Sequence, residues 1–275
     1  MKKLIQLCCA VALLTLAPAL PCQASTFTIG VAPHTSARMI LEMYQPLRRY
    51  LEKTLGYQVD IVTAPDFNEF VKRGISGAYD IAITTSHQAR LLETDAGYLP
   101  LVTYKADFRS VALVASNGKV KTVQDLEGKK VLGLSPTSQV TLWGQHWLKH
   151  NGVNATMKYV SASDSVAQLV AAGVDAAGFT SLANYQKLPS PLRSQVRIMA
   201  QSETMPGRVY VLSPRHTAQY KKIESALWAF AATAEGKKYF ADNKLDGFRR
   251  LKPGELASMD PYAAEVRKVL QGKGQ

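Results

Sequence analysis

The chain has no cysteine beyond position 22. All three of its cysteines, Cys8, Cys9 and Cys22, lie within the first 24 residues. If that segment is removed on export, the rest of the chain has neither a disulfide nor a thiol, and its stability must come from its core. The remaining length is ample for two compact lobes, so no cross-link is needed.

The long apolar run stands at the N-terminus, where Leu4 to Leu20 follow Lys2 and Lys3. The run is followed by Cys-Gln-Ala, with small residues at the first and third positions, so residues 1–24 resemble a secretory signal peptide. The apolar run is too short to favour a membrane span, although an uncleaved anchor is a minor alternative. We expect cleavage after Ala24.

The chain has few acids for its number of bases: 33 Lys and Arg stand against 21 Asp and Glu, a formal charge of +12. Such an excess fits nucleic acid, an anionic membrane surface or a small anionic ligand. The basic residues are scattered, without a long block or an interleaved aromatic platform, which argues against a nucleic-acid partner. A positive surface still raises the rate of encounter with a small anion.

The chain also lacks a long linker, a low-complexity tract and an internal repeat. Strand and helix signals alternate instead, which predicts an α/β protein. Strands are expected at 26–32, 59–63, 78–84 and 131–134, and helices at 36–55 and 67–75. Pro46 is expected to break or kink the first helix, which should end at Gly56. Apolar strands at 111–115 and 209–212 bracket a segment of the right size for an inserted lobe.

No Lys or Arg stands between positions 131 and 148, yet this segment has the pattern of an anion-binding turn. Pro136 ends a short apolar strand, and the apolar spacing that follows places a helix start near Ser138. The unpaired N–H groups of the first helical turn, with the hydroxyls of Ser135, Thr137 and Ser138, can surround a tetrahedral oxyanion. A phosphoryl-transfer loop would need more glycine and a lysine at the helix start, so the segment is expected to bind and not to react. An ordinary Ser/Thr helix cap explains the same residues equally well.

The strand expected at 78–84 ends in a polar cluster that runs from Thr84 to His87. Ligand sites in α/β sheets lie beyond the carboxyl ends of the strands, so Thr84 and Ser86 are candidate ligand contacts. His34 follows the first strand and His87 the third, but each is at least as well explained as a surface histidine.

Catalytic and metal-binding patterns are weak. His146 and His150 stand four apart on a helix, but Trp147 occupies the place of the glutamate of a zinc protease, and no third ligand is evident; no metal site is predicted. No nucleophile, base and orienting acid can be assembled from the motifs, so we expect neither catalytic residues nor a cofactor.

Several short motifs occur in one characteristic order. They are Tyr44-Gln45-Pro46-Leu47, Ala64-Pro65-Asp66-Phe67, Tyr79-Asp80-Ile81-Ala82, Asp125-Leu126-Glu127-Gly128-Lys129, the Pro-Thr-Ser helix start, Gly173-Val174-Asp175-Ala176-Ala177 and Met205-Pro206-Gly207. With these motifs the chain resembles the periplasmic substrate-binding proteins of phosphate, phosphite and phosphonate importers. The resemblance implies the two-lobed type 2 periplasmic binding protein fold, with a ligand cleft between the lobes. Residues 25–111 plus 209–275 would form lobe 1, and residues 112–208 would form lobe 2.

The resemblance also implies ligand contacts. The phosphonate loop of the family is typically Ser-Thr-Ser-Gly, and this chain has Pro-Thr-Ser-Gln, which loses one hydroxyl and the glycine and leaves Thr137, Ser138 and Gln139 at the ligand. Positions that are often tyrosine in phosphonate binders fall on Phe67 and Phe108, so apolar contact would replace two phenol donors.

Two further positions follow from the same resemblance. Ser163, at the start of an expected helix, would face the anion. Where binders of amino-phosphonates carry acids, this chain has Leu182 and Arg208. A guanidinium at that place would repel an amine and attract a second anionic group.

The function that the resemblance implies is capture of a small phosphorus oxyanion in the periplasm. The protein would act as a monomer and present phosphate, phosphite or a phosphonate to the permease of an ABC importer at the inner membrane. An alternative is a sensory version of the same domain, which would signal to a membrane receptor or kinase. An exported hydrolase is a weaker third alternative, because the chain offers no catalytic constellation.

Overall fold

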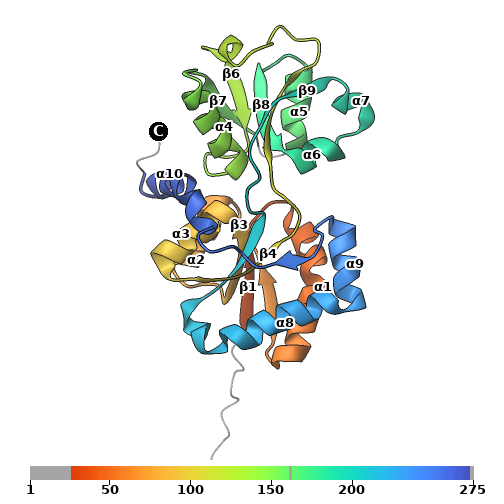
Figure 1. Ribbon diagram of the computed structural model, residues 1–275, viewed down its shortest axis with the longest axis vertical. Coiled ribbons are helices and arrows are strands. Elements are labelled where there is room, and N and C mark those ends of the chain that lie inside the picture. The colour runs from red at the N-terminus through yellow and green to blue at the C-terminus, as the bar shows by residue number, and fades with distance from the viewer. Residues whose placement is uncertain (1–25, 161–162, 273–275) are drawn as a thin grey trace, which may run out of the picture.

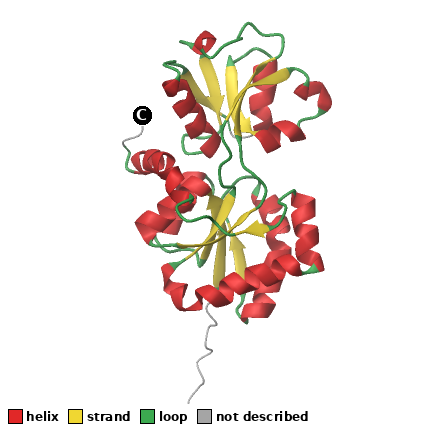
Figure 2. Cartoon of the chain, viewed as in Figure 1, coloured by secondary structure: helices red, strands yellow, loops and turns green. Residues whose placement is uncertain are grey.

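The computed structural model describes residues 26–160 and 163–272, without the side chains at positions 163 and 164. The predicted signal peptide, residues 1–24, lies outside these ranges. The described chain forms two lobes, each built on its own sheet, with helices packed on both faces of the sheet (Figures 1 and 2). No helix in the described ranges is long and apolar enough to cross a bilayer.

The first lobe contains a six-stranded sheet in the order β11-β4-β10-β3-β1-β2. Strands β1, β2 and β3 are parallel, and β10 runs antiparallel to both β3 and β4. The strands are β1 (Phe27–Val31), β2 (Val59–Val62), β3 (Ile81–Thr85), β4 (Leu99–Tyr104), β10 (Arg208–Leu212) and β11 (Phe248–Arg249). The helices are α1 (Ala37–Leu55), α2 (Phe67–Ile75), α3 (Ser86–Ala96), η2 (Pro214–Gln219), α8 (Tyr220–Ala232) and α9 (Ala234–Asn243).

Helix α1 shows how local signals and packing combine. Its first turn is capped by Ser36, whose side chain accepts from the N–H of Met39, and it ends at Gly56 in the left-handed conformation. The helix runs through Pro46 without the predicted break. Proline removes only one backbone hydrogen bond, and the buried face of the helix packs on the core both before and after it. That face consists of Ile40, Tyr44, Leu47, Leu51 and Leu55.

The second lobe contains a five-stranded sheet in the order β7-β6-β8-β5-β9. Strand β6 is parallel to β7 and β8, and β5 is antiparallel to β8 and β9. The strands are β5 (Ser110–Ala115), β6 (Lys130–Gly133), β7 (Thr156–Tyr159), β8 (Ala177–Ser181) and β9 (Val196–Gln201). The helices are η1 (Gln124–Leu126), α4 (Gln139–His150), α5 (Ser163–Ala171), α6 (Leu182–Lys187) and α7 (Ser190–Arg193).

Two chain segments, 105–109 and 202–207, connect the lobes. They pair with each other through Phe108 and Met205, which exchange backbone hydrogen bonds of 2.9 and 3.3 Å. The sheets divide a few residues away from the predicted limits: Val111 lies in β5 of the second sheet, and Arg208 begins β10 of the first.

The C-terminal helix α10 (Asp260–Leu270), which follows η3 (Leu256–Met259), contacts both lobes (Figure 1). Arg90 of α3 pairs with Asp260 at 2.6 Å, which ties α10 to the first lobe. Val266 is fully buried in a cluster that contains Leu91 of α3 and Leu142 of α4. The helix therefore packs against α3 of the first lobe and α4 of the second at the same time.

We expect Val266→Ala to lower the free energy of unfolding by about 1–3 kcal/mol, because it leaves a cavity between three helices. Urea unfolding followed by circular dichroism would measure the change. Lys268→Ala, on the exposed side of the same helix, is the matched control and should change stability by less than about 0.5 kcal/mol. Equal effects of the two substitutions would show that α10 adds little through its buried face.

Candidate ligand-binding site

The lobes face each other across the edges where their strands end. In the first sheet, β3 ends at Thr85, and this residue pairs with Arg208 at the start of β10. In the second sheet, β8 ends at Ser181, which pairs with Ser110 at the start of β5. Both connecting segments join these two edges, so the strand ends of one sheet lie opposite those of the other (Figure 1). Ligand sites of α/β sheets are found at such edges.

Helix α4 begins where the sequence predicts, with Ser138 as its cap. The Ser138 hydroxyl accepts from the Thr141 N–H at 3.4 Å and donates to the Thr141 hydroxyl at 2.8 Å. Thr141 also holds the preceding strand, because its hydroxyl accepts from the N–H of Leu134 at 3.0 Å. The hydroxyl of Ser138 therefore fixes the shape of the turn.

Three hydrogen bonds join this turn to the first lobe. The Thr137 hydroxyl donates to the side-chain oxygen of Asn68 at 2.7 Å, and the Thr137 carbonyl accepts from Nε2 of His87 at 2.9 Å. The Gln139 side chain donates to the Ser86 hydroxyl at 3.1 Å. Thr137 and Gln139 of the second lobe thus contact His87 and Ser86 of the first, and these bonds hold the two lobes together.

Several buried polar atoms at the facing edges have no hydrogen-bond partner among the described residues. Such groups are uncommon, because an unsatisfied buried donor or acceptor costs about 1–3 kcal/mol. Hydroxyls form most of this set, and both lobes contribute to it. The atoms are Thr85 Oγ1 and His87 Nδ1 of the first lobe, and Ser110 Oγ, Ser135 Oγ and Thr180 Oγ1 of the second.

Of these five residues, only Ser135 is a predicted ligand contact, and His87 is predicted at least as well to be a surface histidine. The signal for two others was present in the pattern: β3 and β8 are apolar strands that end in Thr-Thr and Thr-Ser. Thr84 is fully buried, and its hydroxyl donates to Gln88 at 2.7 Å. Successive side chains on a strand point to opposite faces, so the Thr85 side chain points away from Gln88. The Thr85 hydroxyl is the unpaired one.

Arg208 lies at the same edge and is half-buried. Its Nη1 contacts Nε2 of His34 and donates to the Tyr44 hydroxyl at 3.4 Å, and its guanidinium stands 5.6 Å from the ring centre of Tyr104. The other ring nitrogen of His34 lies 2.9 Å from the carbonyl of Ala32, so it donates there, and Nε2 accepts from Arg208. None of the ion pairs in the described part of the chain includes Arg208.

Beneath Arg208 lies a cluster of four buried tyrosines, Tyr44, Tyr104, Tyr210 and Tyr239. The Tyr104 hydroxyl is the centre of the cluster, at 2.7 Å from that of Tyr210 and 2.6 Å from that of Tyr239. Burial raises the pKa values of Tyr104, Tyr210 and Tyr239 well above their usual range, so these phenols stay neutral. The guanidinium is thus surrounded by neutral groups.

The remaining predicted contacts lie around this edge. Phe67 begins α2 and packs on the first-lobe core, and Phe108 stands in a connecting segment and packs on the second-lobe core. Ser163 begins α5, but its side chain is outside the described part of the structure.

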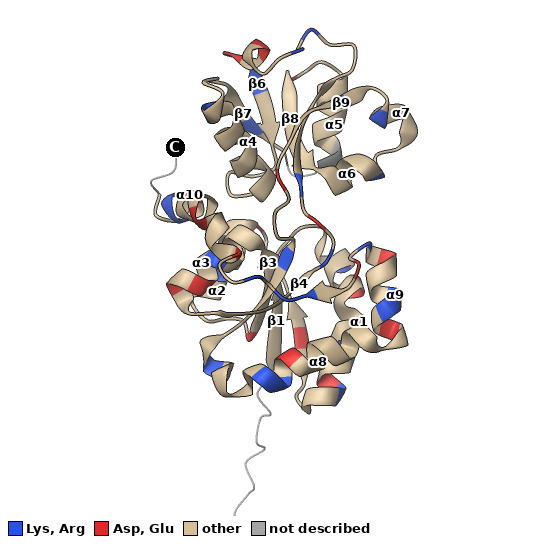
Figure 3. Cartoon of the chain, viewed as in Figure 1, with Lys and Arg blue, Asp and Glu red and all other residues tan. Residues whose placement is uncertain are grey.

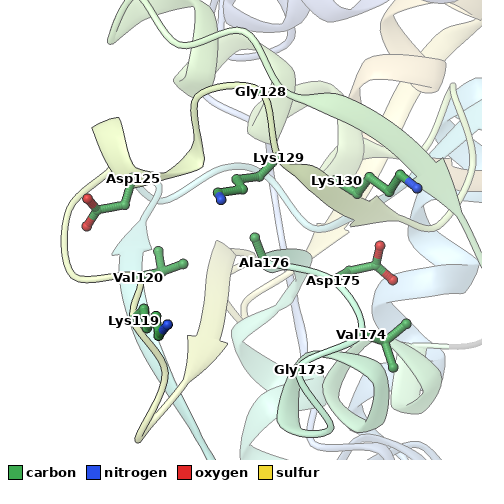
Figure 4. A pocket seen from close by; sticks show the side chains of 10 residues that line it. All are labelled: Lys119, Val120, Asp125, Gly128, Lys129, Lys130, Gly173, Val174, Asp175 and Ala176. Atoms are coloured by element: carbon green, nitrogen blue, oxygen red, sulfur yellow. The ribbon is translucent and has the colours of Figure 1, made fainter.

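A hollow with three lysines lies elsewhere, at the far end of the second lobe (Figure 4). It is lined by Lys119, Lys129, Lys130 and residues 173–176, next to the starts of β6 and β8. This is the amino end of the parallel strands, opposite the edge where ligands bind in such sheets. Lys and Arg are also spread over both lobes, without one dominant block (Figure 3).

Comparison with known proteins identifies the family. Residues 29–256 match the model of the ABC transporter phosphonate periplasmic substrate-binding proteins. The chain belongs to this family. It is therefore a periplasmic component of a transport system and not an enzyme, and the family resemblance drawn from the sequence motifs is confirmed. A search of curated proteins finds no match.

Solved structures share the fold at low sequence identity. XAC2383 from Xanthomonas citri, bound to chloride ion, is 19% identical, with a TM-score of 0.78 over 89% of this chain and 99% of that one. PhnD1 from Prochlorococcus marinus, in complex with methylphosphonate, is 13% identical, with a TM-score of 0.76 over 88% and 98%. A phosphonate transporter component from Pseudomonas aeruginosa is 17% identical, with a TM-score of 0.70 over 91% and 99%. These likenesses confirm the predicted two-lobed periplasmic binding protein fold.

Proposed function

We propose that this protein captures one small phosphorus oxyanion between its two lobes. One observation carries the proposal: unpaired buried hydroxyls stand at the facing strand ends of both sheets, where Arg208 has no acidic partner among the described residues. Hydroxyls and a guanidinium can all donate to an anion, and charge-assisted hydrogen bonds are the strong ones. Phosphate, phosphite and a small phosphonate such as methylphosphonate share the required chemistry.

In this proposal the ligand is held from both sides. The second lobe contributes the Ser135 hydroxyl and the first-turn N–H groups of α4, in the turn that Thr137, Ser138 and Gln139 hold in place, and also Ser163 of α5. The first lobe contributes Arg208 with the polar end of β3, where Thr85 adds to Thr84 and Ser86. Phe67 and Phe108 would supply apolar contact to the substituent of a phosphonate.

The proposed path begins with export directed by residues 1–24 and cleavage after Ala24. The mature monomer would bind its ligand, close about segments 105–109 and 202–207, and dock on the permease of an ABC importer. Ligand release to the permease would require these lobes to separate, which breaks the bonds from Thr137 and Gln139 to the first lobe.

Isothermal titration calorimetry with methylphosphonate, phosphite and phosphate tests the proposal. We expect at least one of them to bind, and we expect Ser135→Ala with Thr180→Val to weaken that ligand by about 2–4 kcal/mol through two lost hydrogen bonds to a charged group. Ser190→Ala, an exposed serine on α7 of the same lobe, is the matched control and should bind like the parent. Absence of binding by all three oxyanions, or equal affinity of the double variant and the control, would contradict the proposal.

A further inference from the structure

His87 differs from the other unpaired groups at the lobe edge because its hydrogen-bonding roles are fixed. It is the second residue of α3 and is fully buried. Its Nε2 lies 2.9 Å from the carbonyl oxygen of Thr137, which can only accept, so Nε2 carries the ring proton. Burial lowers the pKa of His87 to about 4, so the ring is neutral at neutral pH. Its Nδ1 is therefore a buried acceptor.

No described residue makes a hydrogen bond to this acceptor, and the donor of the neighbouring Gln139 side chain is bound to the Ser86 hydroxyl instead, at 3.1 Å. The other unpaired groups are the hydroxyls of Thr85, Ser110, Ser135 and Thr180, which can donate or accept, whereas Arg208 can only donate. Nδ1 of His87 is different, because only a ligand that brings its own N–H or O–H can satisfy it. An oxygen lone pair placed against it would be repelled.

No charged side chain changes this assignment. Arg208 on β10, a cation at the same edge, contacts His34 and Tyr44. The pKa of His87 responds to burial and then to Thr137 and Gln139, and to none of the charged groups on the elements that pack against α3. Ion pairs within and between these elements are Arg73 with Glu69, Arg90 with Glu93 and Asp260, Arg267 with Asp95, and Lys268 with Glu265.

We propose that Nδ1 of His87 accepts a hydrogen bond from a hydroxyl on the phosphorus of the ligand, so that the protein selects a protonated phosphorus oxyanion over a sulfur oxyanion of the same shape. The inference rests on the proposed function. Phosphate and phosphonates lose their last proton close to neutral pH and so offer a P–OH group there. Sulfate and sulfonates are fully deprotonated and present only acceptor oxygens, so the same site disfavours them. The proton stays on the ligand throughout.

The test compares methylphosphonate with methanesulfonate, which differ at the tetrahedral centre and in that proton. With the protein purified from the periplasm, we expect calorimetry at neutral pH to show methanesulfonate binding about 10- to 100-fold more weakly. His87→Phe keeps a ring and removes the acceptor, so methylphosphonate should lose affinity by about the same factor while methanesulfonate does not. His87→Asn restores an acceptor near the Nδ1 position and should recover part of the preference. His150→Phe, at the exposed end of α4, should leave both affinities unchanged.

The outcomes separate the inference from the proposed function. If His87→Phe weakens both ligands equally, the residue has only a structural role and the inference is overturned. Equal binding of the two ligands by the parent also overturns it, while capture of an oxyanion stands. Binding of no phosphorus oxyanion overturns both.

The parent protein gives a second test if His87→Phe does not fold. Raising the pH through the second ionisation of methylphosphonate removes the P–OH group, so the affinity should fall. A constant or rising affinity would contradict the inference.

Discussion

Replacing Arg208 with Met should weaken methylphosphonate binding by about 2–4 kcal/mol, because it removes charge-assisted hydrogen bonds to the anion. Arg208 is half-buried, and the groups that it contacts are neutral: His34, the Tyr44 hydroxyl and the ring of Tyr104. A cation withdrawn from water without an acid beside it has lost solvation that only an anionic ligand would replace. Calorimetry on the parent and the variant measures the loss.

The stability of the unliganded variant should change in the opposite sense. Met fills much of the same volume without a charge, so the free energy of unfolding should stay equal or rise. Replacing a residue that serves binding lowers the ligand affinity without lowering the free energy of unfolding. Replacing a residue that serves the structure lowers the free energy of unfolding. Arg38→Met is the matched control, because Arg38 is exposed and pairs with Glu42 on α1. It should leave both quantities within about 0.5 kcal/mol of the parent.

Arg208 should also set selectivity. Aminoethylphosphonate brings an ammonium to a partly desolvated guanidinium, so it should bind more weakly than methylphosphonate, and Arg208→Asp should narrow or reverse the difference. If aminoethylphosphonate binds the parent more tightly, Arg208 does not contact the ligand. Unchanged methylphosphonate affinity in Arg208→Met would lead to the same conclusion.

Local signals made the α4 turn predictable. The strand β6 ends at Gly133, shortly before Pro136, and Ser138 caps the helix that follows, since both effects depend on residues only a few positions apart. The same holds for the Ser36 cap and the Gly56 end of α1. Pro46 does not break the helix, because its local cost is outweighed by the packing of the helix on the core, which local signals do not contain.

The unpaired atoms of the site could not be predicted in the same way. Whether Thr84 or Thr85 has a free hydroxyl depends on Gln88, which takes the hydroxyl of Thr84. His87 appeared in the sequence as a surface histidine at least as readily as a ligand contact, but the structure buries it completely against Thr137 of the other lobe. Hydrogen-bond satisfaction is a property of the packed molecule, so the sequence pattern indicated the edge but not its free groups.

The tyrosine cluster beneath Arg208 likewise joins residues that are distant in the chain: Tyr44 of α1, Tyr104 of β4, Tyr210 of β10 and Tyr239 of α9. We expect Tyr104→Phe to lower the free energy of unfolding by about 2–4 kcal/mol. The change removes the oxygen that the hydroxyls of Tyr210 and Tyr239 share, and both are buried, so each loses a partner that water does not replace.

Urea unfolding at equilibrium measures this prediction, with a lower midpoint and an unchanged slope as the expected result. Tyr57→Phe is the matched control, because the half-buried Tyr57 hydroxyl makes one bond to Gln219, at 3.0 Å, and its loss should cost no more than about 1 kcal/mol.

Phe at position 104 keeps the ring beneath the guanidinium, so methylphosphonate binding should weaken far less than in Arg208→Met. Tyr104→Phe thus tests the tyrosine cluster beneath Arg208, and Arg208→Met tests the contact between Arg208 and the ligand. If Tyr104→Phe costs no more stability than the control, the four hydroxyls do not act as one network, and the position of Arg208 depends on His34 and the strand pairing with Thr85 instead.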